Sequence, residues 1–124
     1  MEKQYKRVDL KKIERSISKE KSLGIEDITL YVLKDESSEP FYKIYGELHG
    51  KTLVSDIIIT YFVYDNDGDI ITKGETNRYG VRGLVTHRIK KAIFYDGFPF
   101  SIYFFVPRGV EVSRIKLEID ECGK

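Results

Sequence analysis

The chain has no tryptophan, a single cysteine and three prolines among its 124 residues. The lone thiol, Cys122, cannot form a disulfide within the chain, and we expect it to be an inert group near the C-terminus. No stretch reaches the roughly 18 consecutive apolar residues of a membrane-spanning helix, and the N-terminus MEKQYKRVDLKK lacks the apolar core of a signal peptide. We therefore expect a cytoplasmic protein, or an exported one if Met1 is not the natural start.

A large excess of either charge is also absent. The 21 Lys and Arg residues balance 20 Asp and Glu residues, which gives a formal net charge of +1. This balance provides no general attraction to nucleic acid or anionic lipid, so any basic site must be local. With 41% hydrophobic and 13% aromatic residues, the composition is typical of one folded domain.

Motifs of catalysis and metal binding are missing as well. His49 and His87 lie on different expected strands, without companion residues at metal-ligand spacing. No G-x-S-x-G elbow and no phosphate-binding glycine loop occurs. We therefore expect no catalytic residue, no metal and no cofactor, and an enzyme is the third choice of function.

The stretch VYDNDGDII, residues 63–71, places four acidic or amide side chains around one glycine. If Gly68 took the sixth position of a calcium-binding loop, Val63 would be first and Gly74 twelfth, where carboxylates are needed. Glycine and asparagine do suit the positive φ angles of a hairpin turn. The stretch is therefore predicted to be a turn between two strands.

The first 24 residues differ from the rest, with eight Lys or Arg against four Asp or Glu up to residue 23. Asp9 as N-cap, apolar residues Leu10, Ile13 and Ile17 at helical spacing, and Gly24 as a stop predict a short amphipathic helix. A helix of this length is only marginally stable in isolation, so we expect it to dock on the folded domain or to remain a basic arm for an acidic partner. We expect a helix or arm over 1–24, a β-domain over 25–120 and a tail over 121–124.

The rest of the chain shows strand patterns rich in β-branched and aromatic residues and separated by turn residues. The expected strands span residues 28–34, 41–50, 56–65, 69–75, 84–94, 98–106 and 112–119. No helical segment lies between them to connect parallel strands. The predicted fold is all-β: an Ig-like or fibronectin-like antiparallel sandwich of about seven strands with a short N-terminal helix or arm.

Three stretches, IYGELHG, LVSDIIITYFVYDNDGDIITKG and GLVTHRIKKAIF, resemble the bacterial FxLYD-type domain. Its pattern is a glycine in an early strand, a Tyr-Asp-x-Asp-Gly turn, and a later strand that ends in phenylalanine. The matching residues are Gly46, Tyr64, Asp65, Gly68 and Phe94. The resemblance covers about half the chain and implies a small Ig-like β-sandwich and a non-enzymatic module.

Two expected strands, 56–65 and 98–106, have one strongly apolar face each, which leaves their other faces outside. If these strands neighbour each other in one sheet, their outward residues form an exposed aromatic stripe. This predicted partner-binding stripe consists of Ile58, Phe62, Tyr64, Tyr103 and Phe105. We expect this stripe to be covered by the N-terminal helix, by a second copy of the chain or by another protein.

We therefore expect a non-enzymatic protein-interaction or assembly module of bacterial type, which binds a protein partner or forms a homodimer. The alternative is nucleic-acid or anionic-ligand binding through the basic loop 78–91 and the N-terminal arm. The cations of that loop are Arg78, Arg82, Arg88, Lys90 and Lys91. Nucleic acid is the less favoured partner, because acids are interspersed in the arm.

Overall fold

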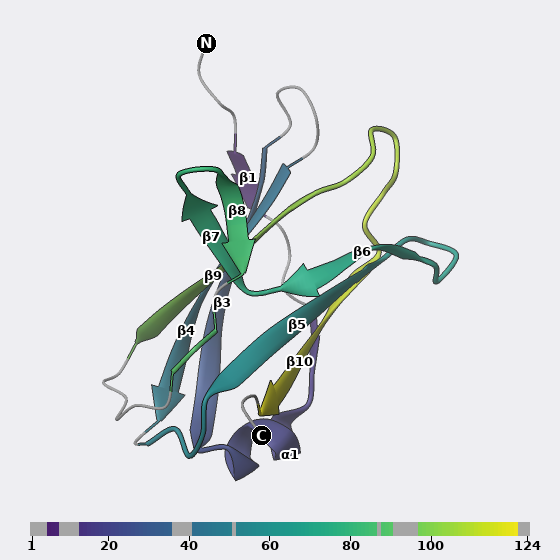
Figure 1. Cartoon of the computed structure of the whole chain (residues 1–124). Coiled ribbons are helices and arrows are strands. Elements are labelled where there is room, and N and C mark those ends of the chain that lie inside the picture. The colour runs from purple at the N-terminus through teal and green to yellow at the C-terminus, as the bar shows by residue number, and fades with distance from the viewer. Residues whose placement is uncertain are drawn as a thin grey trace.

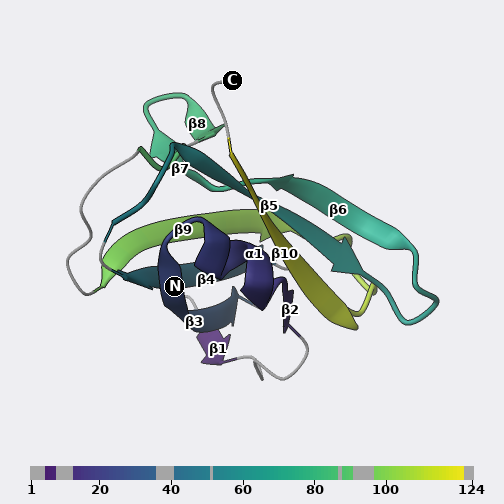
Figure 2. The same ribbon diagram turned by 90° about the horizontal axis from the view of Figure 1, so that it is seen from below.

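The computed structural model describes residues 5–7, 13–35, 41–50, 52–86, 88–90 and 97–121, with backbone only at 5–7 and 78–80. Two four-stranded β-sheets pack face to face (Figure 1), as predicted for an all-β sandwich. Figure 2 shows the two layers, with β3, β4 and β9 in one and β5, β6 and β10 in the other.

The first sheet has the strand order β1-β3-β4-β9, and every pairing in it is antiparallel. Its strands are β1 (Tyr5–Arg7), β3 (Ile25–Asp35), β4 (Phe41–Gly50) and β9 (Phe98–Phe105). The second sheet has the order β2-β10-β5-β6, in which β2 alone runs parallel to its neighbour. Its strands are β2 (Ile13–Arg15), β10 (Arg114–Glu121), β5 (Ile57–Tyr64) and β6 (Ile70–Glu75).

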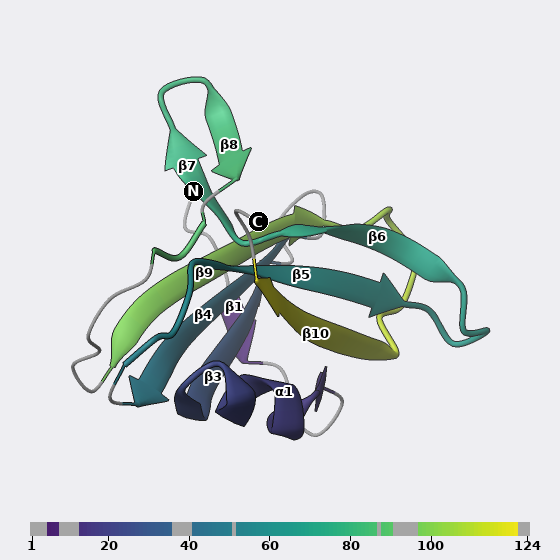
Figure 3. The ribbon, with the colours of Figure 1, turned by 60° about the horizontal axis from the view of Figure 1, so that its bottom comes forward.

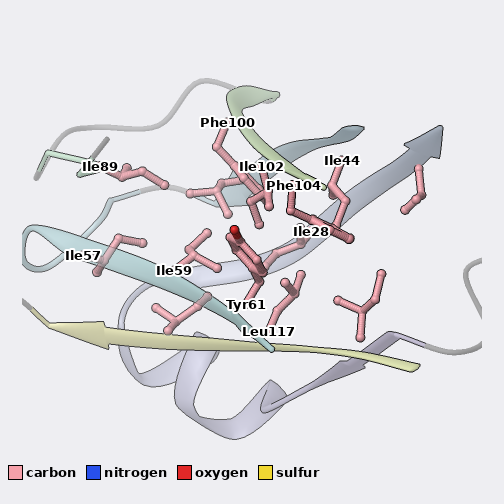
Figure 4. Close-up of a cluster of buried hydrophobic side chains, with 14 of the residues drawn as sticks. Ile28, Ile44, Ile57, Ile59, Tyr61, Ile89, Phe100, Ile102, Phe104 and Leu117 are labelled. Atoms are coloured by element: carbon pink, nitrogen blue, oxygen red, sulfur yellow. The ribbon is translucent and has the colours of Figure 1, made fainter. Parts of the chain in front are cut away.

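Buried residues alternate with more exposed ones along β5 and β10, and their buried side chains contribute to the core between the sheets (Figure 4). In β5 the buried positions are Ile57, Ile59, Tyr61 and Val63, which is the inward face that the sequence predicts. The Tyr61 ring stacks on Phe104 of the opposite sheet, with ring centroids 5.4 Å apart. Burial raises the pKa of the Tyr61 hydroxyl, and a hydrogen bond with Thr72 opposes that shift.

The N-terminal segment differs from the predicted helix. Helix α1 spans only Ile17–Ser22, while Ile13–Arg15 forms the edge strand β2; Asp9 and Leu10 lie outside the described residues. Pairing of β2 with β10 satisfies backbone groups in the sheet, and this tertiary contact outweighs the weak helical periodicity. Gly24, with φ of +97°, follows the end of α1 as expected.

A partly buried ionic cluster fixes α1 against the sandwich. Glu20 is only 3% exposed, and its carboxylate accepts a hydrogen bond from Arg15 Nε at 3.2 Å. Arg15 Nη1 also donates to the carbonyl oxygen of Ile28 at 3.0 Å. Burial raises the pKa of the Glu20 carboxyl, and the neighbouring Arg15 opposes the shift. The cluster therefore joins β2, α1 and β3 at one end of the molecule.

The structure differs from the single strand predicted over residues 84–94. Strands β7 (Asn77–Gly80) and β8 (Gly83–Thr86) form a hairpin that protrudes from the sandwich (Figure 3). Before it, the Thr76 N–H donates to the Ile59 carbonyl; after it, Ile89 and Ile57 exchange two backbone hydrogen bonds of 2.9 Å. The hairpin is thus an insertion in the chain segment that pairs with β5. Residues 87 and 91–94 of the expected strand lie outside the described part.

The turn between β5 and β6 follows the prediction. The Asp65 carboxylate accepts hydrogen bonds from the N–H groups of Asp67 and Asp69, at 2.9 and 3.0 Å. Gly68 has φ of +85°, a conformation that glycine adopts without strain. Asp65 is therefore engaged in holding the turn.

Candidate functional site

The predicted aromatic stripe does not exist as one surface. Strand β5 belongs to the second sheet and β9 to the first, so the two strands are not neighbours in one sheet. Ile58, Phe62 and Tyr64 lie on the outer face of one layer, and Tyr103 and Phe105 on the outer face of the other. The inward faces of both strands are right, but alternation along a strand does not reveal which sheet the strand joins.

The outer face of the second sheet mixes its apolar residues with charges from β10. The Arg114 guanidinium lies 4.0 Å from the centre of the Tyr64 ring and pairs with Glu14 of β2 at 2.9 Å. Phe62 lies between Lys116 of β10 and Lys73 of β6 in the strand register. Ile58, Phe62 and Tyr64 are only partly exposed on this face.

The outer face of the first sheet is more aromatic. Cross-strand pairing puts Tyr31 of β3 beside Tyr45 of β4, and Phe41 of β4 beside Phe105 of β9. Tyr103 lies on the same outer face, two residues before Phe105 on β9. It pairs with Lys43, which lies between Phe41 and Tyr45 on that face of β4. We call Tyr31, Phe41, Tyr45, Tyr103 and Phe105 the aromatic face.

Ring contacts connect most of the aromatic face. Phe41 is stacked on Tyr103 with centroids 6.0 Å apart and tilted against Phe105 at 4.5 Å, while Tyr45 meets Tyr103 edge-on at 6.1 Å. Phe41 itself is 7% exposed, but Tyr31, Tyr45 and Phe105 are 42%, 39% and 52% exposed. The buried Phe41 ring thus supports the exposed Phe105 ring directly and the exposed Tyr45 ring through Tyr103, on strands of a regular sheet.

The edge of this face is secured by Asn77 at the base of the hairpin. Its side-chain oxygen accepts a hydrogen bond from the Tyr103 N–H at 2.8 Å, and its amide nitrogen donates to the Tyr103 carbonyl at 3.1 Å. The Ser101 hydroxyl donates to the Asn77 carbonyl at 2.6 Å. Strand β9 is the last strand of its sheet, and Asn77 supplies part of the pairing that an additional strand would give.

Beside Phe105 the surface is hollowed by an open groove of about 620 Å³. Residues of β6 and of the segment from Phe105 to Arg108 line it: Ile71, Thr72, Phe105, Val106, Pro107 and Arg108. The groove extends the aromatic face toward the side of the sandwich where β6 and β9 face each other.

The predicted basic residues are divided between the hairpin and the segment after it. Arg82 lies in the hairpin turn, and Arg88 and Lys90 flank Ile89; all three are exposed. Lys90 is 3.7 Å from the Asp56 carboxylate. The side chain of Arg78 and the whole of Lys91 lie outside the described part of the chain.

Other chemistry is sparse in the described residues. His49 Nε2 is 2.8 Å from the Thr29 hydroxyl on the neighbouring strand, while His87 and Cys122 lie outside the described residues. Within the described ranges no three His, Cys, Asp or Glu side chains gather as metal ligands do. In the same ranges, no helix has the length and apolar character needed to cross a membrane.

Comparison of the chain with protein-family models, with curated proteins and with solved structures finds no match. Tyr31, Phe41 and Tyr45 were missed in the predicted interface, although alternation in their strands already places them opposite the core-facing residues. Only the strand order shows that they share a face with Tyr103 and Phe105.

Proposed function

We propose that the chain is a non-enzymatic protein-interaction or assembly module, related to FxLYD-type domains, that binds a protein partner or a second copy through its aromatic face. The observation that supports this most is the cluster of three large exposed rings, Tyr31, Tyr45 and Phe105, around stacked Phe41 and Tyr103. Aromatic residues are enriched at protein interfaces, where tyrosine offers rigid apolar area and a hydroxyl group.

The face is also ordered before any partner arrives. Its residues lie on three paired strands, and Asn77 holds the outermost of them. Ordering side chains on binding costs about 0.5–1.5 kcal/mol for each flexible group, so rings already fixed by stacking reduce that cost. This favours recognition by a pre-formed surface.

Light scattering after size-exclusion chromatography, across serial dilutions, tests the self-association branch. If copies associate, Tyr45→Glu shifts the chain to monomer, because it places a charge among apolar rings. The matched control is Tyr64→Glu on the other sheet, which leaves the association unchanged. The reverse result, with Tyr64→Glu the disruptive variant, would assign the interface to the second sheet.

For a chain that is monomeric at every dilution, the partner branch is tested by photo-crosslinking. Benzoylphenylalanine at position 45 is expected to give a discrete crosslinked protein in cells, and the same group at position 64 is not. Equal crosslinking from both positions would contradict a binding role for the aromatic face.

A further inference from the structure

Besides the N-terminal 23 residues, with eight Lys or Arg against four Asp or Glu, the chain has a second basic segment, which contains no acidic residue. Residues 77–91 contain five of the 21 Lys and Arg residues and none of the 20 Asp and Glu residues. The remainder of the chain therefore carries net negative charge, although the whole chain is nearly neutral. Among the described residues, neither Arg82 nor Arg88 contacts a carboxylate, and Lys90 stays 77% exposed beside Asp56.

The same segment exposes apolar side chains at its end. Val81, in the turn between β7 and β8, is fully exposed, and Leu84 and Val85 of β8 are 37% and 45% exposed. A two-stranded hairpin has no core of its own, so these side chains have no interior to enter. Exposed aliphatic groups next to unpaired cations are the combination found on surfaces that enter the interface of a membrane.

The hairpin projects from the sandwich but is fixed at its base. Asn77 binds the backbone of Tyr103, and Ile89 resumes pairing with Ile57 directly after the excursion. Figure 3 shows β7 and β8 extending away from both sheets. A projecting element with a firm base can touch a flat surface without the sandwich approaching it.

We propose that the β7–β8 hairpin docks the protein on an anionic lipid surface. Arg82, Arg88 and Lys90 are attracted to lipid phosphates and carboxylates, and Val81 enters the boundary between headgroups and acyl chains. Nucleic acid fits less well, because sequence-independent binding of single strands uses aromatic stacking, and the apolar side chains described as exposed in the hairpin are aliphatic. This proposal does not rest on the protein interface proposed for the aromatic face.

Vesicle co-sedimentation with the full chain tests the proposal. We expect binding to mixed phosphatidylcholine–phosphatidylserine vesicles and none to pure phosphatidylcholine. Arg82→Glu lowers the partition coefficient by about tenfold or more, since each cation near an anionic surface contributes to binding. Lys21→Glu on α1 makes the same charge change at an exposed position away from the hairpin and alters binding by less than about twofold.

Equal binding to both vesicle types, or equal losses in the two variants, would overturn the proposal. A duplex or single-stranded oligonucleotide that binds the full chain, and loses affinity with Arg82→Glu while anionic vesicles do not bind, would replace lipid by nucleic acid.

A fluorescence experiment tests the insertion of the tip. The chain contains no tryptophan, so Val81→Trp introduces a single reporter at the end of the hairpin. We expect its emission to shift to the blue with anionic vesicles and to be quenched by brominated acyl chains. Val54→Trp, at a valine that is 52% exposed outside the hairpin, keeps its emission. No shift at position 81, or the same shift at both positions, would show that the tip does not insert.

Discussion

Asn77 makes the hydrogen bonds with β9 that a neighbouring strand would make. One side chain pairs with both the N–H and the carbonyl of Tyr103, and so links the base of the hairpin to a residue of the aromatic face. It is also buried, at 9% exposure. The two surfaces proposed for binding therefore share a single polar anchor.

Replacing this anchor is expected to destabilise the fold. Asn77→Ala leaves two backbone groups of Tyr103 without these partners, at a cost of about 1–3 kcal/mol in the free energy of unfolding. Urea denaturation measures the loss, and amide exchange at Tyr103 is expected to accelerate. Asn66→Ala removes an exposed asparagine whose contact with Glu111 is long, at 3.3 Å, and serves as control with a change under about 0.5 kcal/mol. Equal effects of the two variants would contradict the anchoring role.

Glu20 gives a pH dependence whose sign follows from its raised pKa. Because the folded protein raises this pKa above its ordinary 4.5, the folded state takes up the proton at higher pH than the unfolded state. The ionised carboxylate thus costs stability at neutral pH, and the cost fades as pH falls through the folded pKa toward 4.5. Glu20→Gln keeps an acceptor for Arg15 and abolishes the titration.

The stability of Glu20→Gln relative to the unchanged protein is therefore expected to decrease from about pH 7 to about pH 5. Urea denaturation at both pH values measures this trend. An increase on acidification would mean that the pairing with Arg15 dominates over burial and that the pKa is lowered in the folded protein.

At the scale of elements, strands with clear alternation were predicted well and short edge strands were not. The expected strand 41–50 coincides with β4, and the expected 98–106 differs from β9 by one residue. Strands β1 and β2 have three residues each, too few for a period of two to be recognised. Ile13 and Ile17, read as one helical stripe, are divided between a strand and a helix.

The hairpin was missed for a different reason. Its sequence NRYGVRGLVT contains the turn glycines, and Gly83 has the positive φ of +106° that such a turn uses. However, Leu84 and Val85 are adjacent on β8 and both are exposed, so this strand lacks the single apolar face by which a strand is identified. Only the described backbone shows that pairing with β5 stops at Thr76 and resumes at Ile89.

At the scale of the whole molecule, the N-terminal segment provides one edge to each sheet. Strand β1 borders β3 in the first sheet, and β2 borders β10 in the second. The all-β sandwich follows from composition and alternation, but strand order depends on long-range pairing that one sequence does not reveal. For this reason these residues were assigned to one incorrect stripe, although their outward orientations were right.

Removal of residues 1–15 is expected to open the edges of β3 and β10 to other copies. Unpaired strand edges invite pairing between molecules, so the shortened chain should associate as its concentration rises. Light scattering measures this association. The shortened chain also carries Glu20→Gln, because removal of Arg15 would otherwise leave the buried Glu20 carboxylate without its partner. A shortened chain that stays monomeric at every concentration would show that these edges are protected by other means.

The return of the chain at Ile89 has a consequence for how such a fold diversifies. Because the hydrogen bonds of Thr76 and Ile89 fall on Ile59 and Ile57, two positions apart on β5, the chain leaves and re-enters the sandwich at nearly the same place. The residues after Asn77, up to residue 88, form a segment that can be exchanged, whereas Asn77 itself must keep its hydrogen bonds with Tyr103. Related or engineered proteins can therefore differ in the length and chemistry of that segment while the strand order of the sandwich stays the same.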